Sequence, residues 1–197
     1  MPMVGSPQQA LADRSVRELL EAVGAQTPAP GGGAAAALSA SMAAGLVEMA
    51  ARFTRDRDEV AGEAAALREQ LLELGEVELH AYEPVLEALA LDAGDPERDD
   101  RLREALSEAA DSPLAIARAA RSVAERGCEL AVTGNTHLTG DAITGVALAE
   151  AACCAAARLV EINLARVPSD PRLDEAVALT RQAAAARANA LGGTDGT

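Results

Sequence analysis

The stretch from Thr27 to Thr54 constrains the fold of this chain more than any other segment. It reads TPAPGGGAAAALSASMAAGLVEMAARFT and carries no charged side chain from Ala34 to Val47. Alanine, leucine and methionine are good helix formers, and a helix that is apolar on all sides belongs in a protein interior. The prolines hold the approach extended, and the three glycines let the backbone bend sharply. The pattern therefore predicts a glycine-rich loop leading into a buried helix.

The start of this helix has two interpretations. Its first N–H groups lack partners within the helix and carry a partial positive charge, which favours an anionic or carbonyl-bearing ligand. Alternatively, Gly31, Gly32 and Gly33 serve only the close packing of helices. The residues alone leave both interpretations open.

The rest of the chain predicts more helices and no strands. Aromatic residues make up 1% of the 197 residues and hydrophobic residues 49%, so the core must be built from Ala, Leu and Val in closely spaced helices. Helices are predicted over residues 15–24, 33–54, 59–91, 97–110, 112–128, 141–165 and 171–191. We expect an all-α multihelical bundle with long, alanine-rich central helices. It forms a single domain over residues 1–197, with loose termini at 1–11 and 192–197.

Charge and composition argue against several classes of partner. The formal net charge is −14 and every basic residue is Arg, so the chain lacks the basic stripe and the stacking aromatic residues of nucleic-acid binders. The uncharged run is too short to span a bilayer, and the N-terminus lacks the pattern of a signal peptide. We therefore expect a soluble, cytoplasmic protein with neither a nucleic-acid nor a membrane partner.

The cysteines and histidines do not suggest a metal site. The three cysteines are Cys128, Cys153 and Cys154, an odd number that fits small buried residues in a reducing compartment. The two histidines, His80 and His137, have no spacing typical of zinc ligands. We therefore expect no metal.

Glu78 is a carboxylate on an apolar helix arc. At 100° per residue it lies between Leu74 and Tyr82, whereas five other glutamates of this helix fall on the opposite side, namely Glu69, Glu73, Glu76, Glu83 and Glu87. Burial raises the pKa of a carboxyl group and suits it to proton transfer near neutral pH. The alternative is a side chain that leans out to water or pairs with an arginine across an interface.

A polar turn, TGNTHLTGD, precedes the helix predicted from Asp141. Asp141 is either a simple N-cap or the start of the buried face, with Gly145 leaving room beside it one turn later. Asn163 lies on the same stripe but about 33 Å further along, at a rise of about 1.5 Å per residue. Both cannot touch one small reacting centre, so Asn163 serves packing, a second subunit's site or a distant part of a long ligand.

Taken together, these motifs resemble the C-terminal family of formiminotransferase-cyclodeaminase, whose free-standing members include methenyltetrahydrofolate cyclohydrolases. The resemblance covers roughly residues 15–167. Its motifs are the Pro-Gly-Gly-Gly helix start, Glu78-x-x-x-Tyr82, Gly134-Asn135 leading to Gly140-Asp141-Ala142, and Ile162-Asn163-Leu164. The chain departs from the family pattern at Ala34, where Ser is frequent, at Glu78, where Asp is usual, and near Leu159, where Asn is expected.

The resemblance implies a homodimer that acts on a folate one-carbon unit. We expect hydrolysis of 5,10-methenyltetrahydrofolate to 10-formyltetrahydrofolate, with no cofactor beyond the folate substrate. In this assignment Asp141 is the base or cation stabiliser and Glu78 is its acid–base partner. The substrate-binding residues are Gly31, Gly32, Gly33, Asn135, Tyr82 and Asn163.

Two other functions are considered beside this one. A formiminotetrahydrofolate cyclodeaminase would use the same groups and differ only in its leaving group, ammonia. The lack of an attached formiminotransferase domain favours the cyclohydrolase. The third candidate is a non-catalytic helical protein that binds folate or promotes oligomerisation.

Overall fold

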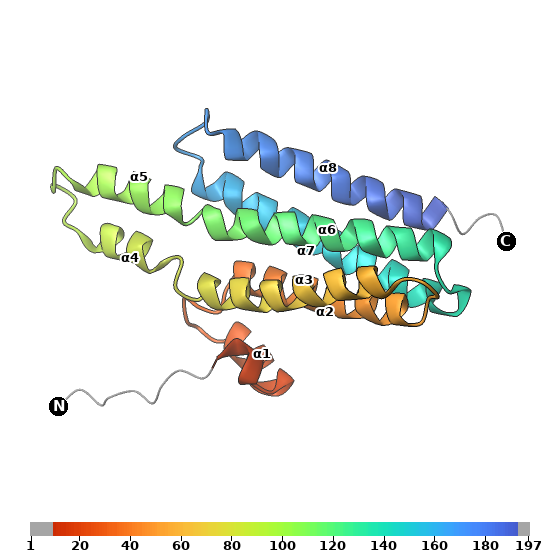
Figure 1. The fold of residues 1–197 in the computed structure, drawn as a ribbon. Coiled ribbons are helices and arrows are strands. Elements are labelled where there is room, and N and C mark those ends of the chain that lie inside the picture. Colours follow the sequence, from red (N-terminus) through yellow and green to blue (C-terminus); the bar gives the residue numbers. More distant parts are fainter. Residues whose placement is uncertain (1–9, 193–197) are drawn as a thin grey trace.

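The computed structural model describes residues 10–192, which form helices joined by short loops (Figure 1). The elements are η1 (Leu11–Asp13), α1 (Val16–Val23), α2 (Gly32–Arg52), α3 (Asp58–Glu78), α4 (Glu83–Ala90), α5 (Arg98–Glu108), α6 (Asp111–Thr133), η2 (Thr136–Leu138), α7 (Thr139–Asn163) and α8 (Pro171–Gly192). The described residues contain no strand, so the predicted all-α class is confirmed.

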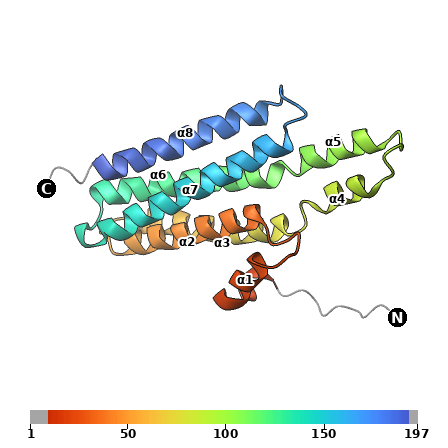
Figure 2. The ribbon, with the colours of Figure 1, turned by 180° about the vertical axis from the view of Figure 1, so that it is seen from behind.

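Four long helices, α2, α3, α6 and α7, form the central bundle, and α8 packs along α6 and α7 (Figures 1 and 2). The core is mostly alanine, as expected, and small residues bring the helix axes close together. A Cβ atom added to Gly127 of α6 would lie 2.7 Å from Val146 Cγ2 of α7 and 3.1 Å from Val47 Cγ2 of α2. Three helices therefore meet at a point where only glycine fits.

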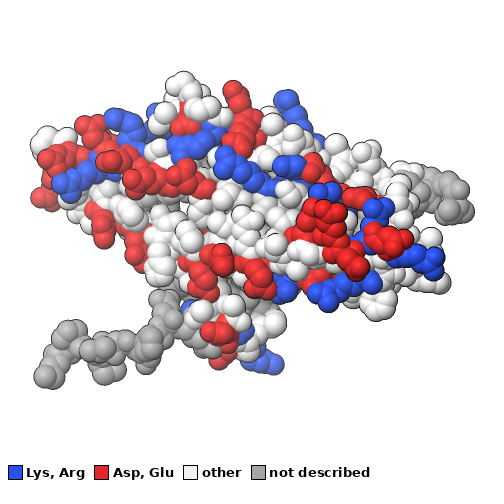
Figure 3. Space-filling view, in the orientation of Figure 1, with Lys and Arg blue, Asp and Glu red and all other residues white. Residues whose placement is uncertain are grey.

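The α4–α5 hairpin projects beyond one end of this bundle (Figure 1). It has a small core of its own, made of Val85, Ala88, Leu102, Ala105 and Ala109. Acidic side chains gather over this arm (Figure 3). The arm therefore brings negative charge to the end of the bundle that holds the C-terminus of α3.

The helix predicted over residues 59–91 is interrupted, and this corrects the sequence-based boundary. The chain leaves the helix after Glu78 and resumes at Glu83, so Pro84 lies in the first turn of α4 and does not kink a continuous helix. Proline is tolerated there because the N–H that it lacks would have no partner in the helix. Because of this break, the helical periodicity of α3 does not continue into α4. Tyr82 is therefore 45% exposed, although the periodicity of one continuous helix placed it on an apolar arc.

The start of α6 also differs from its prediction. The helix begins at Asp111, two residues before Pro113, so Ser112 is inside the helix and is not its N-cap. Ser112 is buried in the bundle. Proline has no N–H, so Pro113 cannot bond the carbonyl four residues earlier, which belongs to Ala109. The short gap between α5 and α6 thus leaves a carbonyl available to another helix.

The N-terminal part of the described chain is better packed than predicted. Leu11 is buried, and its N–H donates a hydrogen bond to Glu76 Oε1, so this residue does not belong to a loose terminus. The capping box of α1 is confirmed, because Ser15 and Glu18 each accept a hydrogen bond from the other's backbone N–H. The remaining terminal residues, 1–9 and 193–197, lie outside the described residues.

Two helical segments, residues 32–52 and 136–163, are long and apolar enough to cross a membrane by length and composition. The first exceeds the short uncharged run considered above, because the helix continues past Val47 to Arg52. Both segments belong to the central bundle, where the core side chains of α2 and α7 pack against each other. Their apolar character therefore has an explanation within the fold.

Candidate active site

A pocket of about 280 Å³ lies where the start of α2, the end of α3, the start of α6 and the end of α7 meet. Its lining residues are Pro28, Gly31, Gly32, Gly33, Glu78, Ala81, Tyr82, Ala109, Pro113, Leu159, Ile162 and Asn163. A neighbouring hollow of about 290 Å³ shares Pro28, Glu78 and Tyr82 with it. Small-molecule sites are commonly about 300–1,000 Å³, so the two hollows together provide suitable space.

Among the residues that the structure describes, Glu78 is the only carboxylate in the lining of this pocket. Its Oε1 is buried and has no hydrogen-bond partner among the described residues. Burial raises the pKa of Glu78 above its ordinary value of 4.5, and the nearby Ser112 hydroxyl partly opposes that rise. A carboxyl group with one buried, unpartnered oxygen is costly for the fold alone, and such groups are candidates for proton transfer.

Gly33, in the first turn of α2, touches the carboxyl group of Glu78 directly. A Cβ atom at this position would lie 1.8 Å from Glu78 Oε2 and 2.4 Å from its Cδ. Gly32 has no atom within 4 Å of an added Cβ, so the crowding is specific to Gly33. The glycine start of α2 therefore serves more than helix packing, because Gly33 makes room for the carboxyl group of Glu78.

The backbone at the start of α2 provides hydrogen-bond donors. Gly31 occupies the N-cap position and makes no side-chain cap, so the first N–H groups of the helix receive no protein acceptor from it. Gly31, Gly32 and Gly33 line the same pocket as Glu78. The site thus combines polarised N–H donors with a carboxyl group, and it suits a ligand that presents both an acceptor and a cationic or protonated centre.

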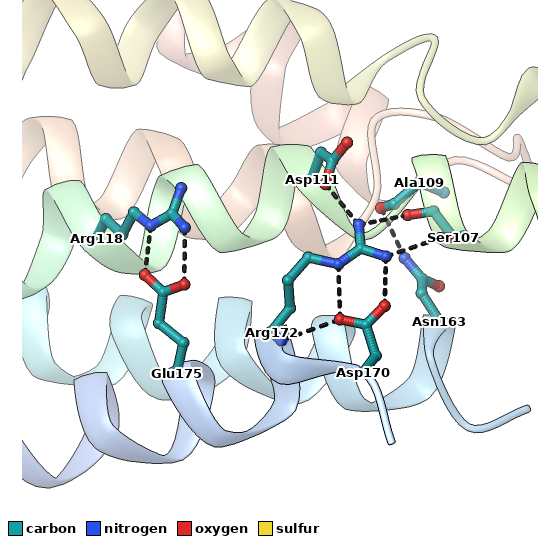
Figure 4. Close-up of polar contacts among 8 residues, drawn as sticks. All are labelled: Ser107, Ala109, Asp111, Arg118, Asn163, Asp170, Arg172 and Glu175. Carbon is teal, nitrogen blue, oxygen red and sulfur yellow. Dashed lines mark hydrogen bonds and ion pairs between the residues drawn. The ribbon is translucent and has the colours of Figure 1, made fainter. Parts of the chain in front are cut away.

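Asn163 forms the opposite wall together with the gap between α5 and α6. Its Nδ2 donates a 2.8 Å hydrogen bond to Ala109 O, the carbonyl that Pro113 leaves free (Figure 4). Its Oδ1 accepts no hydrogen bond from the described residues. The other lining residues of this wall are apolar, and they include Leu159.

The predicted site set omits six lining residues of the pocket, which are Pro28, Ala81, Ala109, Pro113, Leu159 and Ile162. It also did not foresee that Ser112 lies near Glu78. The sequence does show that Pro113 has no N–H and so leaves the Ala109 carbonyl without a partner within the helix. It does not show that Asn163, on another helix, donates to that carbonyl. Leu159, noted above as a departure from the family pattern, lines the pocket. The position at which the chain departs from that pattern therefore belongs to the pocket.

The structure does not bring Asp141 to this pocket, and the expected convergence of Asp141 with Glu78 within one chain is corrected here. Asp141 lies in the first turn of α7, whereas the pocket uses the last turn, about 33 Å away at a rise of about 1.5 Å per residue. Gly145 leaves no room for a ligand, because its added Cβ would lie 3.2 Å from Ala43 O of α2. It serves the close approach of α2 and α7.

Asn135 lies at the same distant end and has a local structural role. Its Nδ2 donates to Phe53 O at 2.9 Å, its N–H donates to Thr54 Oγ1 at 3.0 Å, and its Oδ1 accepts from the His137 N–H. These bonds fasten the loop before α7 to the end of α2. Within one chain, Asn135 therefore does not face the pocket of Glu78.

Comparisons with known proteins agree with this architecture. The sequence matches the family described as formiminotransferase-cyclodeaminase over residues 15–183. The methenyltetrahydrofolate cyclohydrolase of Methylorubrum extorquens is 30% identical, and the match covers 88% of this chain and 92% of that protein. The formimidoyltransferase-cyclodeaminase of Sus scrofa is 31% identical over 83% of this chain, which corresponds to 33% of that longer protein. The crystal structure of a formiminotetrahydrofolate cyclodeaminase from Thermotoga maritima superposes with a TM-score of 0.81 at 25% identity, over 94% of this chain and 98% of that one.

Proposed function

Because the chain belongs to the formiminotransferase-cyclodeaminase family, we propose that it is a methenyltetrahydrofolate cyclohydrolase, which hydrolyses 5,10-methenyltetrahydrofolate to 10-formyltetrahydrofolate. The observation that carries this proposal is the carboxyl group of the half-buried Glu78, whose Oε1 is buried without a partner and whose Oε2 lies beside the glycine start of α2. The M. extorquens relative matches over nearly its whole length, which supports the choice of reaction.

The substrate makes modest chemical demands on the protein. The 5,10-methenyl bridge is an amidinium-like cation whose carbon is already electrophilic, so the reaction calls on no metal or further cofactor. Glu78 takes a proton from the attacking water as the new carbon–oxygen bond forms. The bond from that carbon to N5 then breaks, N5 gains a proton, and the hydroxyl proton leaves as the formyl group forms. One proton is released overall, and a carboxyl with a raised pKa is suited to these transfers.

The remaining groups of the pocket orient the folate. The N–H groups at Gly32 and Gly33 donate to an acceptor on the pterin ring, and the free Oδ1 of Asn163 accepts from one of its N–H groups. Tyr82, which borders both hollows, covers the bridge between pterin and aminobenzoyl group. These contacts place the bridge carbon close to Glu78.

The second candidate is a formiminotetrahydrofolate cyclodeaminase, which would protonate departing ammonia in the same pocket. It is supported by the likeness to the T. maritima structure. That chain is itself of similar length, since the match covers 98% of it. The size of the unit therefore does not separate the two reactions, contrary to the expectation drawn from sequence.

Parallel assays distinguish these functions. We expect the protein to accelerate the loss of near-ultraviolet absorbance of 5,10-methenyltetrahydrofolate well above the uncatalysed rate, and to release no ammonia from 5-formiminotetrahydrofolate. Ammonia release with formation of the methenyl compound would instead identify a cyclodeaminase. Binding without either reaction would leave the non-catalytic folate-binding protein, and absence of binding would contradict a folate function altogether.

We further propose that two copies of the chain pair through the exposed apolar face that α2 and α7 form together. Figure 2 shows these two helices side by side. Met42 of α2 is 62% exposed, and Ala147, Ala151 and Ala155 form an exposed stripe on α7. Since α2 and α7 are antiparallel, a two-fold axis across this face would bring Asp141 of one copy toward Glu78 of the other. A cytoplasmic location, with no membrane or nucleic-acid partner, completes the proposal and follows from the acidic composition.

A shared site makes a specific prediction. Glu78→Gln and Asp141→Asn chains should each be nearly inactive alone. Mixed under conditions that exchange subunits, they should regain about a quarter of the wild-type activity, because about half of the dimers are mixed and each has one intact site. The recovery is measured with the absorbance assay, while light scattering reports the dimer. Full activity of the Asp141→Asn chain alone, or no recovery on mixing, would remove Asp141 from the site.

A further inference from the structure

Arg172, the second residue of α8, lies behind the pocket wall and makes a dense set of polar contacts (Figure 4). Its Nε and Nη2 donate to Asp170 at 3.0 and 2.8 Å, and its Nη1 donates to Asp111 Oδ1 at 2.6 Å. Nη1 and Nη2 also donate to Ser107 O and Ser107 Oγ at 2.8 and 2.7 Å. All five N–H donors of the guanidinium are thus used.

These contacts span the gap between α5 and α6. Ser107 belongs to the last turn of α5 and Asp111 is the first residue of α6. Between them lies Ala109, whose carbonyl accepts the hydrogen bond from Asn163. Arg172 therefore holds both sides of the short segment that presents Ala109 and Pro113 to the pocket. It does not line the pocket itself.

We propose that Arg172 is a positioning residue that sets the orientation of the Asn163 amide in the pocket. The Asn163 amide donates to the carbonyl of Ala109, which lies in the gap between α5 and α6. The direction of that carbonyl depends on the conformation of the gap, which the contacts of Arg172 with Ser107 and Asp111 fix. When the gap is fixed, the Asn163 Nδ2 bond is satisfied and Oδ1 is turned toward the ligand. A small displacement of a positioning group can cost a large factor in rate, because reactive geometry is narrow. This inference rests on the proposed function of the pocket.

The anionic partners of Arg172 keep this arrangement in place at neutral pH. Hydrogen bonds from Arg172 lower the pKa of Asp170 to about 2, so that Asp170 stays ionised. Since the folded-state pKa lies below the ordinary value of 3.8, the stabilisation is present above that value and is lost as the pH falls toward 2. The contacts therefore persist throughout the range in which the reaction would be assayed.

A double-mutant cycle tests the inference. Arg172→Met should lower kcat/KM for methenyltetrahydrofolate by about tenfold, and should have less than about a twofold further effect in the Asn163→Ala background. Arg172→Lys, which keeps the charge but not the forked geometry, should restore part of the loss. The matched control is Arg118→Met. Arg118 also joins α6 to α8, through a bidentate pair with Glu175 at 2.6 and 2.7 Å, but it lies outside the pocket. The Arg118→Met change should therefore leave kcat/KM within about twofold of the wild-type value.

A second readout does not depend on catalysis. The side-chain amide protons of Asn163, observed by nitrogen-15 NMR, should shift in Arg172→Met and stay in place in Arg118→Met. Additive effects in the cycle, or an unmoved Asn163 amide, would overturn the inference. If the wild-type protein hydrolyses no folate, the proposed function fails while the NMR comparison still decides the role of Arg172. If the Arg172→Met protein does not fold, Ser107→Ala replaces it, because this change removes only the hydrogen bond from Arg172 to Ser107 Oγ. Ser107→Ala should shift the Asn163 amide signals in the same direction but by a smaller amount.

Discussion

Replacing Glu78 by Gln is expected to lower kcat for methenyltetrahydrofolate hydrolysis by about 10²- to 10⁴-fold, the range typical of general acid–base groups. The substitution keeps the shape of the side chain and removes its ability to carry the proton. The wild-type rate should rise with pH as the carboxyl ionises, with a midpoint above the ordinary 4.5, and this limb should be missing in Glu78→Gln. The measurement is the pH profile of kcat and of kcat/KM.

The same variant should be more stable than the wild type at neutral pH. Because burial raises the pKa of Glu78 in the folded state, its favourable contribution to folding is fully present below 4.5 and is lost as the pH rises through the raised pKa. Gln carries no charge, so its advantage should appear above that range and vanish in acid, as measured by urea denaturation at several pH values. Glu73→Gln, an exposed change on the same helix, is the control for both measurements. Unchanged turnover in Glu78→Gln would eliminate Glu78 as the proton carrier.

Replacing Gly33 by Ala is expected to lower kcat/KM about 100-fold while the protein stays folded. The new methyl group would lie 1.8 Å from Glu78 Oε2, so the carboxyl group must move. It can do so at modest cost, because it is the end of a flexible side chain, and alanine favours the helix by about 1 kcal/mol over glycine. The prediction therefore separates loss of function from loss of fold, and thermal melting together with the absorbance assay measures both.

Gly62→Ala provides the matched control for this substitution. Gly62 lies within α3 and has no atom within 4 Å of an added Cβ, so this variant should be active and slightly stabilised. Adding Gly33→Ala to Glu78→Gln should cost little more activity, since the displaced group is already inactive. A Gly33→Ala protein with wild-type turnover would show that the position of the Glu78 carboxyl does not matter.

Several features of the candidate site were predictable because they depend on local sequence. Proline, glycine and alanine in succession predict a loop and a buried helix, since their backbone preferences act within a few residues. The unusual position of Glu78 was visible from helical periodicity, which reports the face of a single helix. Tyr82 shows where this reasoning stops. Its arc assumed one continuous helix, and the break before α4 turned the side chain outward.

The residues by themselves determined that the chain is helical, that small and aliphatic side chains build its core, and that Glu78 lies on an apolar helix arc behind a glycine-started helix. These features follow from the backbone preferences of the residues and from the 3.6-residue period of a helix. Only the tertiary structure decided which helix ends meet. It placed Glu78 and Asn163 in the lining of one pocket, and it placed Asp141 and Asn135 at the far end of the bundle. It also gave Arg172 its partners on α5 and α6. The physical reason is that a helix separates the residues at its two ends by a constant rise per residue. Which helix ends come into contact therefore depends on how neighbouring antiparallel helices pack, and not on the distance between residues along the sequence.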